Sequence, residues 1–280
     1  MTEILNGAVL ANNIKRKAKT RIAKLKHPPG LAVILVGDHP ASALYVRLKE
    51  EAAKDVGIYV EKFTYPKDAT TQELIQKISD LNARPDIHGI LVQLPLVDQD
   101  VEAVIGAIHP SKDVDGFHPE NRRSLLANAP VLVPPVALAV MRLIQATRRP
   151  LTNRSAVVLG NSAVFAEPII ELLREAGVTA TLVTRNTPAL SAVTRGSDII
   201  IVALGEAGFL KPDMVQEAAI VIDVGTNKVG TRTVGDADPA LEGHVGFLSK
   251  VPGGVGPLTV AYLLTNVMKA MESQHREGIK

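Results

Sequence analysis

Four polar residues in the first half of the chain have types and spacings that could support chemistry on a small organic molecule. Tyr45 and Lys49 are four positions apart, so on a helix they would share one face. Gln93 follows an apolar run, and Asp115 precedes a glycine. A lysine can move a proton, and a carboxylate can accept hydrogen bonds from N–H groups. Each residue also has an ordinary interpretation, since such pairs are common on helices and Asp-Gly favours turns.

Apolar runs that alternate with helical patterns would position these residues. Residues 31–36 and 89–94 are typical of buried strands, and residues 58–65 alternate like a further strand. Helices are expected at 42–56 and after the capping-box sequence 70–73. This alternation predicts a parallel α/β sheet, and ligands bind outside the carboxyl ends of such strands. The loops that carry the polar residues would therefore meet at one edge.

A second α/β series follows a proline-rich joint at residues 128–135. The pattern predicts strands at 155–159, 179–183, 198–203 and 219–223, a helix at 168–176, and a strongly apolar last helix at 258–271 that packs back on the first domain. At the amino end, Leu5, Val9, Leu10 and Ile14 have helical spacing. We expect an α/β fold of two α/β domains flanking a cleft, the second a Rossmann-type parallel sheet. The predicted domains are 1–134 with the helix 257–280, and 135–256.

Composition argues against several classes of protein. Lys and Arg total 31 against 29 Asp and Glu, and aromatic residues make up 3%, so a nucleic-acid partner is not expected. The basic stretch 15–26 has apolar residues at helical spacing and should form the solvent face of a helix. Cysteine is absent and the seven His lack ligand spacing, so no metal site is expected. Without a signal-peptide core or a bilayer-length run, we expect a cytoplasmic protein with no membrane partner.

Four motifs, in this order and spacing, resemble the methylenetetrahydrofolate dehydrogenase/cyclohydrolase family over nearly the whole length of the chain. They are long and unusual in composition, so a match to all four would not be expected by chance. The motifs are Asp38-His39-Pro40-Ala41-Ser42 with Tyr45, Val46 and Lys49; Val92-Gln93-Leu94-Pro95-Leu96; Pro110-Ser111-Lys112-Asp113-Val114-Asp115-Gly116-Phe117-His118-Pro119 with Asn121; and Pro252-Gly253-Gly254-Val255-Gly256-Pro257-Leu258-Thr259.

The resemblance implies an activity and roles for the four residues. The enzyme would oxidise 5,10-methylenetetrahydrofolate with NADP and hydrolyse the methenyl product to 10-formyltetrahydrofolate, as a cytoplasmic homodimer in the one-carbon metabolism that serves purine biosynthesis. Lys49 would be the central catalytic group, oriented by Gln93, while Tyr45 stacks near the folate and Asp115 accepts hydrogen bonds from the pterin. The implied folate-binding set is Tyr45, Lys49, Val92, Gln93, Leu94, Asp115, Gly253, Gly254, Pro257 and Thr259.

The cofactor loop departs from the family pattern. Asn161 replaces the usual Arg, Ala166 replaces the second Gly, and Glu167 adds a negative charge. Arg185 could compensate, because an Arg at the end of the second Rossmann strand commonly meets a 2′-phosphate; it favours NADP, while NAD stays possible. The alternative is that Arg185 is a solvent-facing loop residue. The implied cofactor-binding set is Gly160, Asn161, Ser162, Thr184, Arg185, Ala203, Gly225 and Thr226.

Other functions stay open on these grounds. The chain could be a divergent paralogue that is mainly a cyclohydrolase, or a folate-binding protein with weak or no dehydrogenase activity. It could also be a different Rossmann dehydrogenase that acts on a small hydroxy or amino acid. Binding and turnover with folate and with each dinucleotide would separate these alternatives.

Overall fold

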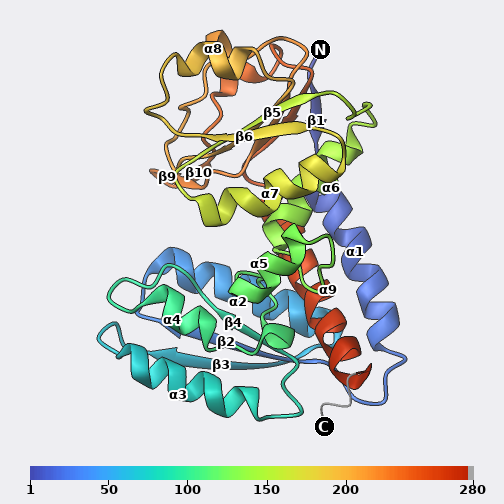
Figure 1. The fold of residues 1–280 in the computed structure, drawn as a ribbon, viewed down its shortest axis with the longest axis vertical. Helices are drawn as coiled ribbons and strands as arrows, with labels where there is room; N and C mark the ends of the chain where they lie inside the picture. The colour runs from blue at the N-terminus through green and yellow to red at the C-terminus, as the bar shows by residue number, and fades with distance from the viewer. Residues whose placement is uncertain (277–280) are drawn as a thin grey trace. The chain divides into compact units, whose positions relative to one another are not determined.

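Two units, each built on a parallel sheet, make up the chain in the computed structural model, which describes residues 1–276 (Figure 1). Unit 1 contains Met1–Ala11 and Val136–Thr259; unit 2 contains Asn12–Pro135 and the chain from Val260 onward. The predicted α/β class is confirmed. The division differs from the sequence-based ranges in placing the first eleven residues with the later segment. The end of the predicted helix 257–280, residues 277–280, lies outside the described residues.

The sheet of unit 2 has three parallel strands in the order β3-β2-β4. Its central strand is buried on both faces. Leu31 and Val33 pack against the helices α1, α2 and α9, while Ala32 and Ile34 face α3 and α4 (Figure 1). The elements of this unit are most of α1 (Gly7–Ile22), β2 (Gly30–Val36), α2 (Pro40–Val56), β3 (Tyr59–Tyr65), α3 (Thr71–Asn82), β4 (Gly89–Val92), α4 (Val101–Gly106), η1 (Pro110–Lys112), α5 (Pro119–Leu126) and most of α9 (Val255–Arg276).

Local signals explain where the helices of unit 2 begin and end. The side chains and backbones of Thr70 and Glu73 form the predicted capping box of α3. Helix α2 begins with Pro40 in its first turn and ends at Gly57. The basic residues of α1 are largely exposed, as predicted, and the helix buries Ala18 and Ile22, whereas Ile14 is half-buried and Val9 is exposed. From Val260 onward α9 packs on the sheet of this unit, which confirms the prediction for the last helix.

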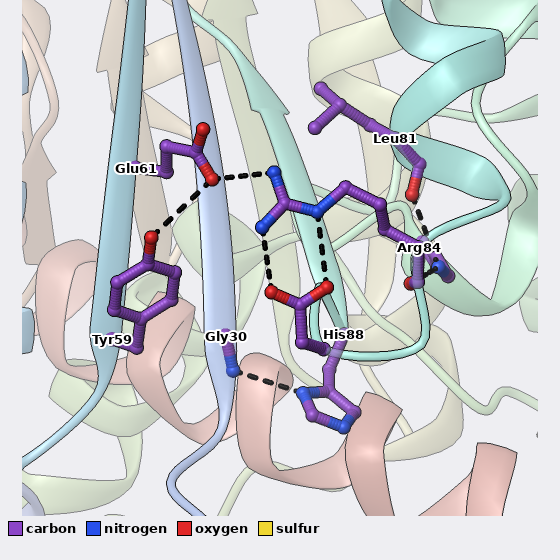
Figure 2. A network of polar contacts seen from close by, with 8 residues as sticks. Gly30, Tyr59, Glu61, Leu81, Arg84 and His88 are labelled. Carbon is purple, nitrogen blue, oxygen red and sulfur yellow. Dashed lines mark hydrogen bonds and ion pairs between the residues drawn. The ribbon is translucent and has the colours of Figure 1, made fainter.

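A polar network holds the amino-terminal edge of this sheet together (Figure 2). The guanidinium of Arg84 bonds the carboxylates of Glu61, at 2.6 Å, and Asp86. His88, directly before β4, accepts a hydrogen bond at Nδ1 from the backbone N–H of Gly30, at 2.9 Å (Figure 2). Burial lowers the pKa of His88 to about 4, so its imidazole is neutral at pH 7. This edge is thus fixed, while the loops at the opposite edge carry the polar residues identified in the sequence.

Unit 1 contains a six-stranded parallel sheet in the order β1-β11-β8-β7-β5-β6. From β5, the chain runs first to one side of that strand and then to the other. Its elements are β1 (Glu3–Leu5), α6 (Pro135–Ala146), β5 (Ser155–Gly160), α7 (Ala163–Glu175), β6 (Thr179–Val183), α8 (Leu190–Arg195), β7 (Ile199–Ala203), η2 (Pro212–Met214), β8 (Ile220–Asp223), the hairpin strands β9 (Asn227–Val229) and β10 (Arg232–Val234), η3 (Pro239–Leu241) and β11 (Phe247–Ser249).

Two elements of unit 1 correct the sequence-based prediction. Leu5 was assigned to a helical pattern, which is wrong, because Glu3–Leu5 pairs with Phe247–Ser249 at the edge of the sheet. Helix α7 begins five residues before the predicted start at Pro168, since Ser162 caps it by accepting a hydrogen bond from the N–H of Phe165. Pro168 lies in the second turn, where it removes one hydrogen bond without ending the helix.

Candidate active site

Strands β2 and β4 bring Lys49 and Gln93 together in unit 2. Their pairing places the residue after β4 beside the end of β2, where the N–H of Gln93 donates to the carbonyl of Ile34 at 2.9 Å. The chain then leaves β2 through a short loop into α2, whose inner face carries the buried Lys49. Tyr45 lies one turn earlier and is half-buried. The site is therefore built at the carboxyl ends of the strands, as the pattern predicts.

A hydrogen bond joins the two side chains. The Lys49 ammonium Nζ donates to Gln93 Oε1 at 3.0 Å, and Gln93 Nε2 donates to the carbonyl of Leu94 at 2.7 Å. The second bond fixes which end of the amide faces the lysine, because a carbonyl can only accept. Gln93 thus presents an acceptor to Lys49, and the predicted contact between them is confirmed.

Asp115 is the predicted acidic residue of this site. It lies half-buried in the loop that follows η1. Burial raises the pKa of Asp115, and the positive charge of Lys49 offsets part of this increase. The two charged groups therefore lie close enough in unit 2 to interact.

The loop before Asp115 is held by the neighbouring Asp113. Its carboxylate accepts hydrogen bonds from the N–H groups of Gly116 and His118 and from the Asn121 side chain, at 3.1, 2.8 and 2.9 Å. Burial raises the pKa of Asp113 to about 6, against the effect of these hydrogen bonds. The turn at Gly116 is thus held by the side chain of Asp113, and the carboxylate of Asp115 is the one we assign to a ligand.

Lys112 also holds this loop in place, a role that could not be predicted from the sequence. Its ammonium is buried and donates to the carbonyls of Leu81, Asn82 and Arg84 at 3.2, 2.9 and 2.7 Å, at the carboxyl end of α3. Burial lowers the pKa of Lys112 to about 8. A cation is favourable at this end of a helix, where unpaired carbonyls gather. Asn266 of α9 adds a hydrogen bond to the carbonyl of Val114, at 2.9 Å.

The remaining predicted folate residues fall in two groups. Val92 and Leu94 flank Gln93 in unit 2. The other four belong to unit 1: Gly253, Gly254, Pro257 and Thr259. Gly253 accepts a hydrogen bond from the N–H of Ala8 at 3.0 Å, and the hydroxyl of Thr259 donates to the carbonyl of Val255 at 3.1 Å.

The predicted cofactor residues of unit 1 lie at or just after the carboxyl ends of the four adjacent strands β6, β5, β7 and β8. The order β6-β5-β7-β8-β11 makes β5 and β7 the point where the chain changes direction, and dinucleotides bind in the crevice at such a point. Gly160 ends β5 and pairs with Ala203 at the end of β7. Asn161 and Ser162 then lead into α7, whose first N–H groups suit a phosphate. These features fit a dinucleotide.

The cofactor loop differs from the family pattern at Asn161, Ala166 and Glu167, and their burial shows which of them lie at the surface. The methyl group of Ala166 is fully buried in the packing of α7, so it takes no space at the exposed start of the helix. Asn161 is exposed and Glu167 is half-buried. Arg185 and Thr184 follow β6 and are both exposed, and Arg185 forms an ion pair with Glu206, which the sequence analysis did not single out.

Two buried carboxylates organise the loops after β7 and β8. Asp236 accepts hydrogen bonds from the N–H groups of Leu204 and Gly205, at 2.6 and 2.9 Å. Asp223, at the end of β8, accepts from the N–H groups of Gly225 and Asp236, both at 3.0 Å, and burial raises its pKa to about 6. A Cβ at Gly225 would lie 2.2 Å from the Asp236 carboxylate, so only glycine fits there. The predicted residues Gly225 and Thr226 thus belong to a fixed loop.

Residues 1–276 contain no helix that is both long and apolar enough to cross a bilayer. Within the same residues, no three His, Asp or Glu side chains lie together in a way that could hold a metal ion.

Comparisons with known proteins match both halves of the chain to one family. Residues 5–115 match the tetrahydrofolate dehydrogenase/cyclohydrolase catalytic domain, and residues 134–275 match the NAD(P)-binding domain of the same family. The bifunctional protein FolD of Burkholderia pseudomallei is 44% identical over 275 residues, which cover 96% of each chain.

Solved structures agree with this match. The bifunctional FolD dehydrogenase/cyclohydrolase of Campylobacter jejuni is 38% identical, with a TM-score of 0.94 over 98% of this chain and all of that one. The Trypanosoma brucei dehydrogenase-cyclohydrolase, solved with NADP and an inhibitor, is 32% identical, with a TM-score of 0.93 over 98% of this chain and 99% of that one. The chain therefore belongs to the tetrahydrofolate dehydrogenase/cyclohydrolase family, which confirms the resemblance seen in its motifs.

Proposed function

We propose that this enzyme oxidises 5,10-methylenetetrahydrofolate to 5,10-methenyltetrahydrofolate with NADP and hydrolyses the product to 10-formyltetrahydrofolate. The observation that carries the proposal is the hydrogen bond from Lys49 to Gln93, formed beside Asp115 in a chain of this family. The nearly full-length match to bifunctional relatives supports both activities. Among residues 1–276 we find nothing that favours a chain that is mainly a cyclohydrolase, since Asn161 is exposed and the methyl group of Ala166 is buried within the packing of α7.

The residues of unit 2 divide the work on the folate. Asp115 would accept hydrogen bonds from the amino and ring N–H groups of the pterin, which suits the two oxygens of a carboxylate. Lys49 would lie near the reacting carbon and handle the proton in the hydrolysis, with Gln93 holding its ammonium in place. Tyr45, on the same face of α2 as Lys49, would stack near the ring system, and Val92 and Leu94 would line the site.

The residues around the end of β5 in unit 1 would hold the dinucleotide. NADP, when bound, accepts the hydride, so the protein has mainly to bind and orient it. The start of α7 would bind the pyrophosphate, and Arg185 would meet the 2′-phosphate. The set comprises Gly160, Asn161, Ser162, Thr184, Arg185, Ala203, Gly225 and Thr226, and we assign the backbone at Gly253 and Gly254, with Pro257 and Thr259, to folate binding.

The wider setting is also a proposal. Unit 2 would be the folate-binding unit and unit 1 the dinucleotide-binding unit, which agrees with the names of the two matching family domains. By family resemblance we expect a homodimer in the cytoplasm whose product serves purine biosynthesis. Light scattering on the purified protein would give twice the mass of one 29.8 kDa chain if the dimer forms.

Two assays on the purified protein test the function. Reduction of NADP in the presence of 5,10-methylenetetrahydrofolate measures the dehydrogenase, and the loss of methenyltetrahydrofolate absorbance measures the cyclohydrolase. We expect both activities, each reduced strongly in Lys49→Met. Hydrolysis without reduction of either NADP or NAD would support the cyclohydrolase alternative. Failure to bind any folate would overturn the proposal and favour a different Rossmann dehydrogenase.

A further inference from the structure

An ion pair lies across the end of β5 in unit 1. The Arg185 guanidinium Nη1 and the Glu206 carboxylate Oε1 are 2.5 Å apart. Arg185 follows β6 and Glu206 follows β7, and β5 lies between these two strands in the sheet. The strands are parallel, so both residues leave the sheet at its carboxyl edge. The pair thus joins the two sides of the crevice at which a dinucleotide would enter.

The charges of this pair act in opposite directions on the two possible cofactors. A 2′-phosphate on the ribose would bind the Arg185 guanidinium, which matches phosphate geometry well. The Glu206 carboxylate competes for the same guanidinium and repels the phosphate. The ribose of NAD has a hydroxyl at that position, and an acidic residue accepts a hydrogen bond from it in NAD-binding Rossmann sheets. Arg185 alone therefore favours NADP, whereas Glu206 favours NAD.

The backbone that carries Glu206 is anchored, so its carboxylate stays near the crevice when the ion pair opens. The N–H groups of the two preceding residues, Leu204 and Gly205, donate to the fully buried Asp236. The carbonyl of Glu206 accepts a hydrogen bond from the N–H of Phe209 at 3.2 Å. The part of Glu206 that can be displaced is thus its side chain, once the bond to Arg185 opens. Both side chains of the pair are partly exposed, at 52% for Arg185 and 35% for Glu206, so a ligand can reach them.

We propose that Glu206 is a specificity-determining residue that lowers the preference for NADP by neutralising Arg185, and that it accepts a hydrogen bond from the 2′-hydroxyl of NAD. The inference rests on the proposed function, since it requires a dinucleotide at the end of β5. It gives the chain a weaker discrimination between the two cofactors than Arg185 alone would produce.

The test compares dissociation constants for NADP and for NAD, measured by calorimetry, in the wild type and in Glu206→Gln. This variant removes the charge and keeps the size of the side chain. We expect NADP to bind roughly tenfold more tightly, because a competing exposed ion pair and a like charge are both removed. NAD should bind about threefold more weakly, as its hydroxyl loses a charged acceptor. Thermal unfolding should be unchanged, since exposed pairs contribute little to stability.

Glu217→Gln is the matched control. Glu217 is exposed and lies just before β8, at the opposite edge of the same sheet, so this variant makes the same change in net charge away from the crevice. It should leave both dissociation constants as they are. The substitution Glu206→Gln is also made in a protein that carries Arg185→Met. There it should raise the affinity for NADP much less than in the wild type, because the carboxylate has no guanidinium to neutralise.

Three results would count against the proposal. Equal changes in the affinities for NADP and NAD, or none, in Glu206→Gln would overturn the role of Glu206 and leave the proposed function intact. The same shift in Glu217→Gln would show an effect of net charge alone and would also overturn it. Failure of the wild type to bind either dinucleotide would overturn the proposed dehydrogenase activity together with this inference.

Discussion

Lys49 of helix α2 donates a hydrogen bond at 3.0 Å to Gln93, which directly follows β4, and Gln93 is itself fixed by its bond to the carbonyl of Leu94. We therefore expect the amide to act on the reaction through the lysine that it orients. Its contribution should be one of orientation, separable from the chemical contribution of the lysine.

The variants Lys49→Met and Gln93→Met separate these contributions. Lys49→Met removes the group that handles the proton, and the turnover number for methenyl hydrolysis should fall by roughly 100-fold or more. Gln93→Met keeps a similar volume and removes the amide, both the acceptor for Lys49 and the donor to the carbonyl of Leu94, while the lysine stays, so the fall should be about tenfold, with little change in KM. Steady-state kinetics of the cyclohydrolase measure both. An equal loss in the two variants would contradict a role for Gln93 through Lys49 alone.

Asp115→Asn tests the carboxylate proposed to bind the pterin. Loss of a charge-assisted hydrogen bond should weaken folate binding by roughly 10- to 100-fold. Because burial raises the pKa of Asp115, the wild type should begin to lose folate affinity at a higher pH than an ordinary aspartate would as the solution is acidified. Asp115→Asn should lack this step. The measurement is a folate binding titration at several pH values, and an identical pH dependence in the variant would assign the titration to another group.

The three carbonyl bonds made by Lys112 should support both stability and folate binding. Lys112→Met would remove the one ammonium that donates to the carbonyls of Leu81, Asn82 and Arg84, at a cost of about 2–4 kcal/mol in the free energy of unfolding. The loop that carries Asp115 would loosen, so KM for the folate should rise more than kcat falls. Denaturant unfolding and kinetics check this. The exposed Lys17→Met, which removes the same charge from α1, should change neither quantity.

The lowered pKa of His88 predicts that the free energy of unfolding decreases at acidic pH. Its pKa is about 4 in the folded chain, against an ordinary value of 6.5, so between these values the unfolded chain binds the proton and the folded chain does not. The contribution of His88 to stability is complete above pH 6.5 and is lost as the pH falls to 4, by about 3 kcal/mol. His88→Asn keeps an acceptor for the N–H of Gly30 and does not titrate. Urea unfolding from pH 7 to pH 4 should therefore be less steep in the variant.

Most strands of the two sheets could be predicted, because strands that are buried on both faces consist mainly of apolar residues. Residues Leu31–Ile34 form a continuous apolar run since alternate side chains serve two different cores. Strands β1 and β11 were not predicted, because three residues carry little pattern and the pairing joins Glu3 to Phe247, distant in sequence. The start of helix α7 was predicted wrongly for a different reason. Pro168 suggested a helix start in the sequence, but the helix begins earlier, where the hydroxyl of Ser162 caps it.

The site could be predicted from whole motifs and not from spacing. Tyr45 and Lys49 at four residues apart are an ordinary pattern on a helix, and only the combined motifs gave them a role. Residues that act through tertiary partners had no signal in the sequence. Lys112 resembles any lysine until α3 supplies three carbonyls, and Glu206 resembles any loop glutamate until β6 brings Arg185 to it.

The chain enters and leaves each unit more than once, which has a consequence for how it is made. Strand β1 is synthesised long before its partner β11, which is not available until residue 249 has been added. Unit 2 likewise lacks the apolar face of α9 until Leu263 and Val267 have been added. Neither unit can therefore complete its core while only the first half of the chain has been made. A gene divided at Pro135 would accordingly yield two fragments that each expose a bare core face, and soluble protein should be recovered only when both are expressed together.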